Sequence, residues 1–158
     1  MTVPAATAGE GVTVRQAERA DLLAVYRIET ASFPQPWPYD AFECFLGEPG
    51  FLVAVDGKRV VGYVVADVTR SYGRGLGHVK DVAVHPDRRG RGVGSLLLAR
   101  ALFVLTLDGA TSVKLEVRES NHRAQRLYES FGFETLRRVH QYYDDGEDAL
   151  VMIRELEP

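Results

Sequence analysis

The stretch between residues 79 and 107 constrains the fold more than any other part of this sequence. Residues 79–84 are rich in valine and predict a short strand, which Pro86 would end. Three glycines and three arginines lie within residues 88–94, and the chain then becomes rich in leucine and alanine for more than three helical turns. A strand, a glycine-rich loop and a helix in this order direct several free backbone N–H groups at one place.

This loop predicts a binding site for a phosphate or a pyrophosphate. Glycines let a ligand approach the backbone closely, a helix N-terminus carries partial positive charge, and the arginines strengthen the positive field. The loop is not a P-loop, because no Gly-Lys-Ser/Thr follows a glycine at the required spacing. It is not the fingerprint G-x-G-x-x-G either, because Ser95 and Leu97 stand where the third glycine would be. The alternative is an ordinary surface turn that binds no ligand.

Three motifs follow one another along the chain. Residues 89–94 (RGRGVG) fit the pattern Arg/Gln-x-x-Gly-x-Gly/Ala directly after the strand; residues 115–121 read LEVRESN and residues 126–133 read RLYESFGF. With these motifs, the sequence resembles the GNAT acetyltransferase superfamily over roughly residues 12–156, and in particular its RimI-type protein N-terminal acetyltransferases. The resemblance implies that residues 89–94 bind the pyrophosphate of acetyl-CoA.

Length and composition indicate one domain. A chain of 158 residues buries about two-thirds of its unfolded surface, and no apolar run approaches the ~20 residues that span a membrane. The net charge of −3 gives no general attraction to nucleic acid or anionic lipid. We therefore expect a disordered tail at residues 1–11, a GNAT domain at residues 12–158, and neither a nucleic-acid nor a membrane partner.

The terminus and the single cysteine favour a cytoplasmic protein. The first residues have neither the basic start nor the apolar core of a secretory signal. One cysteine excludes an internal disulfide, and we expect Cys44 to be a buried, inert thiol within a short helix.

Hydrophobic periodicity and turn residues predict one mixed α/β sheet of about seven strands with four helices. Because a helix crosses over between the fourth and fifth strands, these two strands should run parallel. The GNAT resemblance adds that they splay apart, with the pantetheine arm of CoA in the gap. The expected strands are 12–15, 51–55, 60–68, 77–84, 113–117, 133–143 and 149–155, and the expected helices 21–32, 40–46, 96–107 and 121–131.

Glu116 is the candidate general base. It stands between two apolar residues near the end of the fifth strand, beside the break in the sheet where open α/β folds bind ligands. The alternative is an exposed strand glutamate. The resemblance implies that Glu116 takes the proton of the attacking amine, through a water molecule.

The resemblance also assigns residues to the cofactor. Tyr128 would protonate the departing CoA sulfur, although it could instead be a core residue. Asn121 would bind the CoA arm, or simply cap a helix. Backbone N–H groups of the fourth strand would hold the acetyl carbonyl and the pantetheine amides. The full expected set is Val82, Ala83, Val84, Arg89, Gly90, Arg91, Gly92, Val93, Gly94, Ser95, Asn121 and Tyr128.

Aromatic residues provide candidate walls for a peptide. The segment between the first two helices is stiff and aromatic, and the final hairpin carries a tyrosine pair. Ordinary turn packing and cross-strand packing are the alternatives. The resemblance implies peptide contacts by Phe33, Trp37, Tyr39, Tyr142 and Tyr143.

Acid–base chemistry favours an α-amine as the acceptor. An α-amine with a pKa near ~7.8 is roughly a tenth neutral at pH 7, whereas lysine near ~10.4 is neutral a few times in ten thousand. We therefore expect direct transfer from acetyl-CoA to the α-amino group of a protein N-terminus, with a ribosomal protein as one candidate. Alternatives are acetylation of lysine or a small amine, and a non-catalytic CoA-binding module. The four histidines show no ligand spacing, so we expect no metal, and the oligomeric state stays open between a monomer and a weak dimer.

Overall fold

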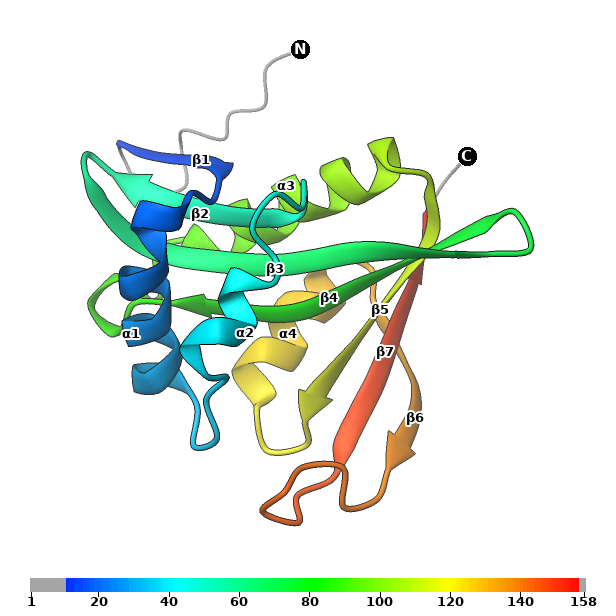
Figure 1. Ribbon diagram of the computed structural model, residues 1–158. Coiled ribbons are helices and arrows are strands. Elements are labelled where there is room, and N and C mark those ends of the chain that lie inside the picture. Colours follow the sequence, from blue (N-terminus) through cyan, green and yellow to red (C-terminus); the bar gives the residue numbers. More distant parts are fainter. Residues whose placement is uncertain (1–10, 157–158) are drawn as a thin grey trace.

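The computed structural model describes residues 11–156, which form one seven-stranded sheet with helices on both faces (Figure 1). The expected tail at residues 1–11 therefore lies outside the described residues, except for Gly11. Short 3₁₀ turns occupy Arg19–Asp21 and Pro86–Arg88. The strands and α-helices are β1 (Val12–Gln16), α1 (Leu22–Ser32), α2 (Tyr39–Glu43), β2 (Phe51–Asp56), β3 (Arg59–Ser71), β4 (Arg74–Val84), α3 (Val93–Leu107), β5 (Ala110–Arg118), α4 (His122–Ser130), β6 (Glu134–Val139) and β7 (Ala149–Glu155).

The strand order β1-β2-β3-β4-β5-β7-β6 confirms the predicted mixed sheet. Among the described strands, β4 and β5 are parallel and every other neighbouring pair is antiparallel. The parallel pair follows from α3, which crosses one face of the sheet between these two strands.

The β3–β4 hairpin is longer than its glycines predict. Both strands continue to a tight turn at Tyr72 and Gly73, where a longer loop was expected. Gly75 lies within β4. It must be glycine, because a Cβ at this position would lie 2.3 Å from the carbonyl oxygen of Gly109. This glycine allows the close approach of the chain just before β5, rather than a turn.

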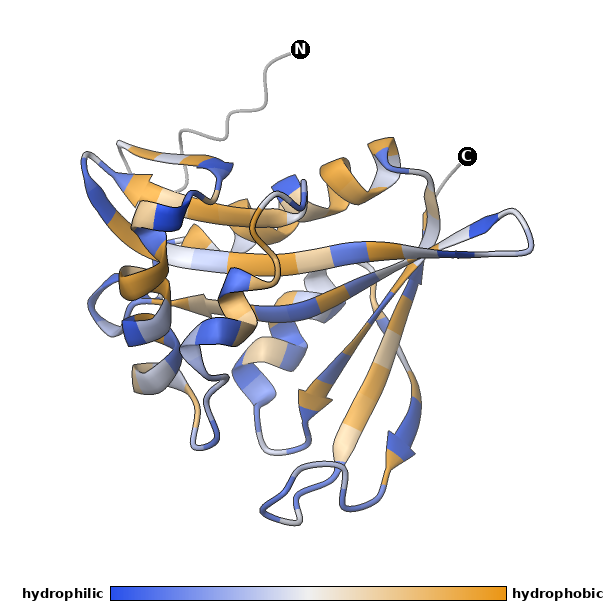
Figure 2. Ribbon diagram, in the orientation of Figure 1, coloured by the Kyte–Doolittle hydropathy of each residue, from blue (hydrophilic) through white to orange (hydrophobic). Residues whose placement is uncertain are grey.

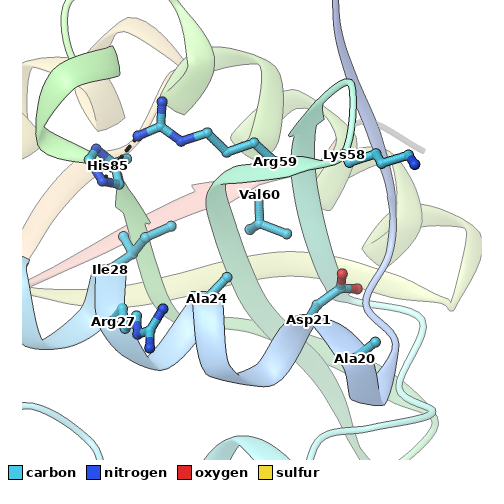
Figure 3. A pocket seen from close by; sticks show the side chains of 9 residues that line it. All are labelled: Ala20, Asp21, Ala24, Arg27, Ile28, Lys58, Arg59, Val60 and His85. Carbon is cyan, nitrogen blue, oxygen red and sulfur yellow. Dashed lines mark hydrogen bonds between the residues drawn. The ribbon is translucent and has the colours of Figure 1, made fainter.

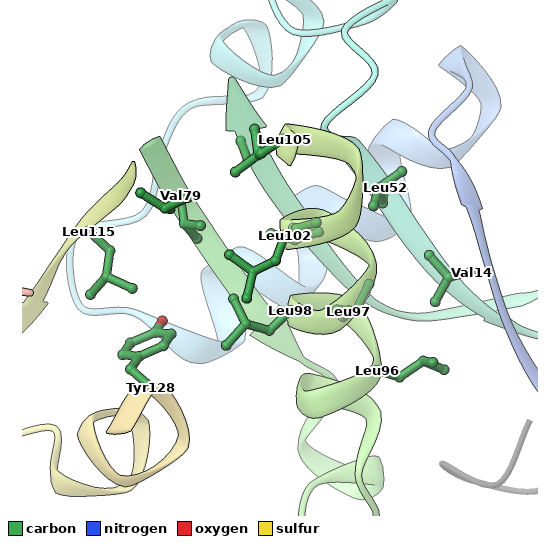
Figure 4. Packing of buried hydrophobic residues seen from close by; sticks show 14 of the residues in the cluster. Val14, Leu52, Val79, Leu96, Leu97, Leu98, Leu102, Leu105, Leu115 and Tyr128 are labelled. Carbon is green, nitrogen blue, oxygen red and sulfur yellow. The ribbon is translucent and has the colours of Figure 1, made fainter. Parts of the chain in front are cut away.

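The two faces of the sheet have separate cores. Figure 4 shows leucines of α3 packed near Val79 of β4 and Leu115 of β5, with Tyr128 of α4 beside them. Burying one such leucine contributes roughly 1.5–3 kcal/mol. The other face packs against α1 and α2 through a cluster that includes Leu22 and Tyr63. Figure 2 shows the apolar residues in orange along α3 and β2, while hydrophilic residues interrupt β4.

β4 and β5 pair over a short distance and then separate (Figure 1). Their ladder begins with Gly75 opposite Ala110 and ends with His78 opposite Lys114. Beyond it β4 continues to pair with β3, and β5 with β7. The structure thus confirms the splay that the family resemblance implied.

Beyond this ladder, one edge of β4 faces no paired strand in the described sheet. The N–H of His85 donates to the carbonyl of Val61 on β3 at 2.8 Å, and successive N–H groups of a strand alternate in direction. The N–H groups of Val82 and Val84 therefore point away from β3, toward the gap. The contact of Arg89 supports this direction. Its Nε donates at 3.0 Å to the carbonyl of Val84, which points to the same side of the strand as the Val84 N–H.

Two details near the first helices differ from the prediction. Asp21 precedes α1 as an N-cap would, but its carboxylate accepts from Arg15 at 2.7 Å and from the Glu18 N–H at 2.8 Å. Cys44 follows the end of α2 and is exposed, so the expected buried thiol was wrong. Two residues after the buried Phe42, Cys44 lies on the opposite side of the helical turn.

The composition of α3 predicted burial on nearly all sides, which is only partly true. Phe103 and Leu107 are 60% and 72% exposed. The sheet covers one face of this helix, so residues on its outer face remain at the surface.

Candidate active site

Glu116 lies on β5 at the place where β4 and β5 separate. Its side chain is 14% exposed, Oε1 lies 2.7 Å from Nε2 of His78, and Oε2 lies 3.5 Å from Nζ of Lys114. Burial acts to raise the pKa of Glu116, but the hydrogen bond and charge of His78, together with Lys114, outweigh it and hold the pKa below its ordinary value. The carboxylate is therefore ionised at neutral pH and can accept a proton.

His78 is a residue that sequence reasoning missed. The four histidines have no metal-ligand spacing, and the sequence does not reveal that His78 of β4 lies beside Glu116 of β5. The parallel register was the available signal, because His78 pairs with Lys114, two residues before Glu116. Residues at i and i+2 of a strand share one face, which brings all three side chains together.

A hollow of about 410 Å³ opens beside this pair. The connection after α1, together with α2, provides one wall, and the loop between β6 and β7 provides the other. The lining residues are Trp37, Pro38, Ala41, Phe45, His78, Lys80, Glu116, Tyr142 and Tyr143. We call this hollow the groove.

Three of the five expected peptide contacts line the groove, and two do not. Trp37, Tyr142 and Tyr143 belong to its walls. Phe33 instead packs against the core under α1 and α2. Tyr39 packs edge-on against the Tyr26 ring, with centroids 6.0 Å apart.

Arg118 fixes the tyrosine wall. Its guanidinium lies 4.1 Å from the centroid of the Tyr143 ring, and its Nη1 donates to Asp145 at 2.9 Å and Glu147 at 2.8 Å. The Glu147 carboxylate also accepts from the N–H of Ser120 at 2.8 Å. These contacts fasten the β6–β7 loop to the end of β5. Burial raises the pKa of Tyr143 to about 12 despite the opposing charge of Arg118, so the phenol stays neutral.

Tyr128 is buried on α4 and packs edge-on against Phe133, with centroids 6.0 Å apart. Its hydroxyl points toward the space between β4 and β5 (Figure 4). Burial is the main cause that raises the pKa of Tyr128 well above its ordinary value, and an ionised Asp81 would raise it further. The phenol therefore carries its proton at neutral pH and can donate it.

The glycine-rich loop leads into α3 through left-handed backbone. Gly90 and Gly92 have φ values of 78° and 83°, and Gly92 is the N-cap of α3. Such φ values favour glycine. The first N–H groups of α3, from Val93 onward, have no partner within the helix.

The arginines of this loop differ in their contacts. Arg88 forms a salt bridge with Asp56 at the end of β2, in which its Nη1 lies 2.6 Å from the carboxylate. Arg89 bonds to Val84 and, through Nη2, to Ser32 Oγ at 3.0 Å, whereas Arg91 is exposed. Ala83 faces the core under α1, and Ser95 is partly buried.

Asn121 caps α4 as its sequence position predicted. Its Oδ1 accepts from the N–H of Ala124 at 3.1 Å. The side-chain amide nitrogen has no part in this cap and is left for another acceptor.

A second, smaller hollow lies beside α1 and the start of β3 (Figure 3). Arg27, Lys58, Arg59 and His85 line it, and Arg59 bonds to the His85 ring at 3.2 Å. None of the expected site residues lines it.

Residues 11–156 contain no cluster of three or more His, Cys, Asp or Glu side chains that could hold a metal ion. No helix in that part of the chain is long and apolar enough to cross a membrane.

Comparison with known proteins places the chain in a family. A model of the acetyltransferase (GNAT) family matches residues 22–133. The N-alpha-acetyltransferase of Saccharolobus solfataricus is 33% identical over 159 residues, covering 94% of this chain and 95% of that protein. The ribosomal protein bS18-alanine N-acetyltransferase of Escherichia coli is 34% identical, covering 89% of this chain and 95% of its own.

A solved structure agrees with these relatives. The crystal structure of Ard1 from Thermoplasma volcanium has a TM-score of 0.87 and 29% identity, and covers 94% of this chain and 99% of its own. The splayed sheet, the glycine-rich loop before α3 and these similarities over most of its length show that this chain belongs to the GNAT family of N-acetyltransferases.

Proposed function

We propose that this chain transfers the acetyl group of acetyl-CoA to the free α-amino group of protein N-termini. The observation that carries the proposal is the His78–Glu116 pair, which lies in a groove with an aromatic wall on each side. Relatives named as N-alpha-acetyltransferases support the same reaction.

Acetyl-CoA would supply its acetyl group as a thioester, and two parts of the chain are suited to bind it. The free N–H groups at the start of α3 would bind the pyrophosphate. The N–H groups of Val82 and Val84 would receive the acetyl carbonyl and the pantetheine arm, and would stabilise negative charge that develops on the carbonyl oxygen.

Proton transfers would divide between two side chains. Glu116, kept ionised by His78, would accept the proton of the amine, directly or through a water molecule. Tyr128, kept neutral by burial, would donate a proton to the departing sulfur. Each group has the protonation state at neutral pH that its role requires.

The groove suits an extended peptide better than a small amine. Trp37 stands on one side and Tyr142 and Tyr143 on the other, so residues after the reacting amine can lie between two rigid aromatic surfaces. The ribosomal-protein acetyltransferases among the relatives make an N-terminal alanine of a ribosomal protein the first substrate to test.

The test is acetyl-CoA turnover against short peptides that vary in their first two residues. N-blocked peptides that contain lysine are the controls, and Glu116→Gln is the comparison enzyme. We expect turnover with free α-amines, a first-residue preference, and a kcat about 10²–10⁴-fold lower in Glu116→Gln with unchanged acetyl-CoA affinity. Turnover on blocked lysine peptides would favour a lysine enzyme, and CoA binding without any turnover would favour a non-catalytic CoA-binding protein.

A further inference from the structure

A second cluster of titratable side chains lies beneath the groove, between α1, β3 and β4. Glu29 of α1 is 2% exposed and Tyr63 of β3 is fully buried. The Tyr63 hydroxyl donates to Oε1 of Glu29 and lies 3.4 Å from Oδ2 of Asp81 on β4. Within residues 11–156, no cationic side chain forms a salt bridge with either carboxyl group. Two acidic groups, the buried Glu29 and the partly buried Asp81, therefore meet without a counter-charge.

The hydrogen-bond donors around Glu29 and Asp81 indicate which of the two carboxyl groups carries a proton. The phenol of Tyr63 has one proton, which it donates to Glu29. The other Glu29 oxygen, Oε2, accepts from the backbone N–H of Trp37 at 2.9 Å. Both oxygens of Glu29 thus receive donors, which favours a negative charge there. A hydrogen bond between Asp81 and the Tyr63 oxygen then needs a proton carried by Asp81.

The electrostatics agree with this count. Burial, followed by the hydrogen bond and the charge of Glu29, raises the pKa of Asp81 well above its ordinary range. Two ionised carboxylates on either side of one hydroxyl group would repel one another, and the burial of Glu29 leaves little water to weaken that repulsion. The pair is more stable when it keeps one proton, as closely spaced carboxyl groups generally do.

We propose that Glu29 and Asp81 hold a single proton between them, and that this carboxyl pair positions the Trp37 wall of the groove relative to the bulged segment of β4. Glu29 binds the backbone of Trp37, which lines the groove. Asp81 lies in β4 between Lys80, another lining residue, and Val82, whose N–H points toward the gap. The inference rests on the proposed function, because it assigns the pair to the same site. Glu29 and Asp81 are positioning residues, which act through Trp37 and Val82.

The β4 irregularity places Asp81 in the cluster. The pairing of β3 with β4 shifts between Val65, opposite Asp81, and Ala66, opposite Val79, so Lys80 is an extra residue in β4. His78 and Lys80 both line the groove, and the shift then turns Asp81 to the same face of the sheet, toward Tyr63 and α1.

Loss of the shared proton should weaken acetyl transfer. The backbone N–H of Val82 lowers the pKa of Asp81 through a hydrogen bond, and an ionised Asp81 would attract this N–H more strongly. That N–H would then be drawn away from the acetyl carbonyl. The other titratable groups around Asp81 are Tyr63 from β3 and Tyr128 from α4, and both are neutral phenols with raised pKa values that offer no positive charge.

The pairing itself can be tested without any enzymatic activity. Side-chain carboxyl carbons of the full-length protein would be followed by ¹³C NMR from about pH 4 to about pH 9, with the backbone amide of Trp37 observed in the same samples. We expect one carboxyl proton to be lost well above the ordinary range, and the Trp37 amide to shift in the same titration. Asp81→Asn, whose amide can donate to the Tyr63 oxygen without titrating, should abolish both signals.

A kinetic experiment tests the positioning role. Above the titration of the pair, kcat/KM of the wild-type enzyme should fall about tenfold per pH unit, because one proton is lost. Asp81→Asn should keep its activity at neutral pH and lose this alkaline limb. Asp108→Asn is the matched control, since Asp108 is an exposed cap of α3 that bonds to Arg70, and it should keep the wild-type profile.

The outcomes separate the two proposals. If both carboxyl groups titrate in the ordinary acidic range, or if Asp81→Asn retains the high titration, the shared proton is disproved. If the titration is present but Trp37 does not respond and the rate profiles of wild type and Asp81→Asn coincide, the positioning role is disproved. Absence of peptide acetylation would contradict the proposed function, while the NMR result would still decide the pairing. Should Asp81→Asn fail to fold, Glu29→Gln is the second variant, in which the remaining titration of Asp81 should move to lower pH.

Discussion

The contact between His78 and Glu116 gives this glutamate a property that strand position alone would not provide. A half-buried carboxylate ordinarily keeps its proton to a higher pH, because burial disfavours charge. The hydrogen bond from the neighbouring strand reverses that tendency. Glu116 is thereby ionised at the pH at which an α-amine begins to be neutral, although the lowered pKa also makes it a weaker base.

Replacing His78 should move the acid limb of the rate profile. His78 lowers the pKa of Glu116, so His78→Ala should raise that pKa, and a base that works only when ionised would then need a higher pH. We expect the acid limb of kcat/KM to shift to higher pH, with little change at the pH optimum or in the alkaline limb. The check is kcat/KM against pH, with the exposed His122→Ala as control. An acid limb that does not move would remove His78 from the tuning of the base.

The glycine-rich loop is the element that joins the sheet to α3. Gly92 must adopt a positive φ to begin the helix, whereas Gly94 is already inside it. A Cβ at Gly94 would meet Leu127 at 3.5 Å and Val84 at 3.7 Å, which are ordinary contact distances. The backbone conformation at Gly92 therefore favours glycine, whereas an alanine side chain would fit at Gly94.

These two positions make a matched pair for testing the loop. Gly92→Ala should cost about 1 kcal/mol in backbone strain and weaken CoA binding, because the loop would move from the left-handed region. Gly94→Ala should bind CoA within a few-fold of wild type. Titration calorimetry with CoA measures both, and equal affinities in the two variants would contradict the assignment of the loop.

The β6–β7 loop is an element held by charge rather than by a core. Hydrogen bonds from Ser120 and Arg118 lower the pKa of Glu147 from 4.5 to about 2. A depressed folded pKa means that the stabilisation is present above the unfolded value and is lost as pH falls through the folded value.

Glu147→Gln should therefore destabilise the protein in a pH-dependent way. We expect its free energy of unfolding in urea to be below that of wild type at pH 7, with a difference that shrinks between about pH 4.5 and about pH 2. Asp144→Asn, in the same loop and exposed, should leave the difference near zero. A deficit in Glu147→Gln that is constant with pH would show that the carboxylate charge is not responsible.

The separation of β4 from β5 is a property of the whole molecule, since helices on both faces and the five other strands fix the two halves of the sheet. It leaves backbone N–H groups of β4 facing the gap. Such groups lose no sheet partner when a ligand binds, so they are ready to accept one.

Hydrogen exchange tests this arrangement residue by residue. The amides of Val82 and Val84 should exchange faster than that of Ala83, whose N–H points toward β3. Acetyl-CoA should slow exchange at Val82 and Val84 and leave Ala83 nearly unchanged. Uniform protection of all three amides would mean that binding closes the gap as a whole.

Local rules in the sequence were enough for the order of elements. Alternating apolar residues predicted the strands, and the leucine-rich stretch after Gly94 predicted α3. The predicted ends of the β3–β4 hairpin were wrong, because Gly75 stands where two chain segments approach closely rather than in a loop. The predicted burial of Cys44 was wrong, because a short helix exposes one side whatever its composition.

For the candidate site, too, some features follow from the sequence and others only from the tertiary structure. Sequence by itself determined the glycine loop and the candidates Glu116, Tyr128 and Asn121, because their motifs are contiguous and their spacing is set by one strand or one helix. Only the tertiary structure decided that His78 tunes Glu116, that Arg118 holds Tyr143, and that Glu29 meets Asp81 across Tyr63. These pairs join residues far apart in the chain, and their energies depend on burial and on strand register, which no local pattern encodes.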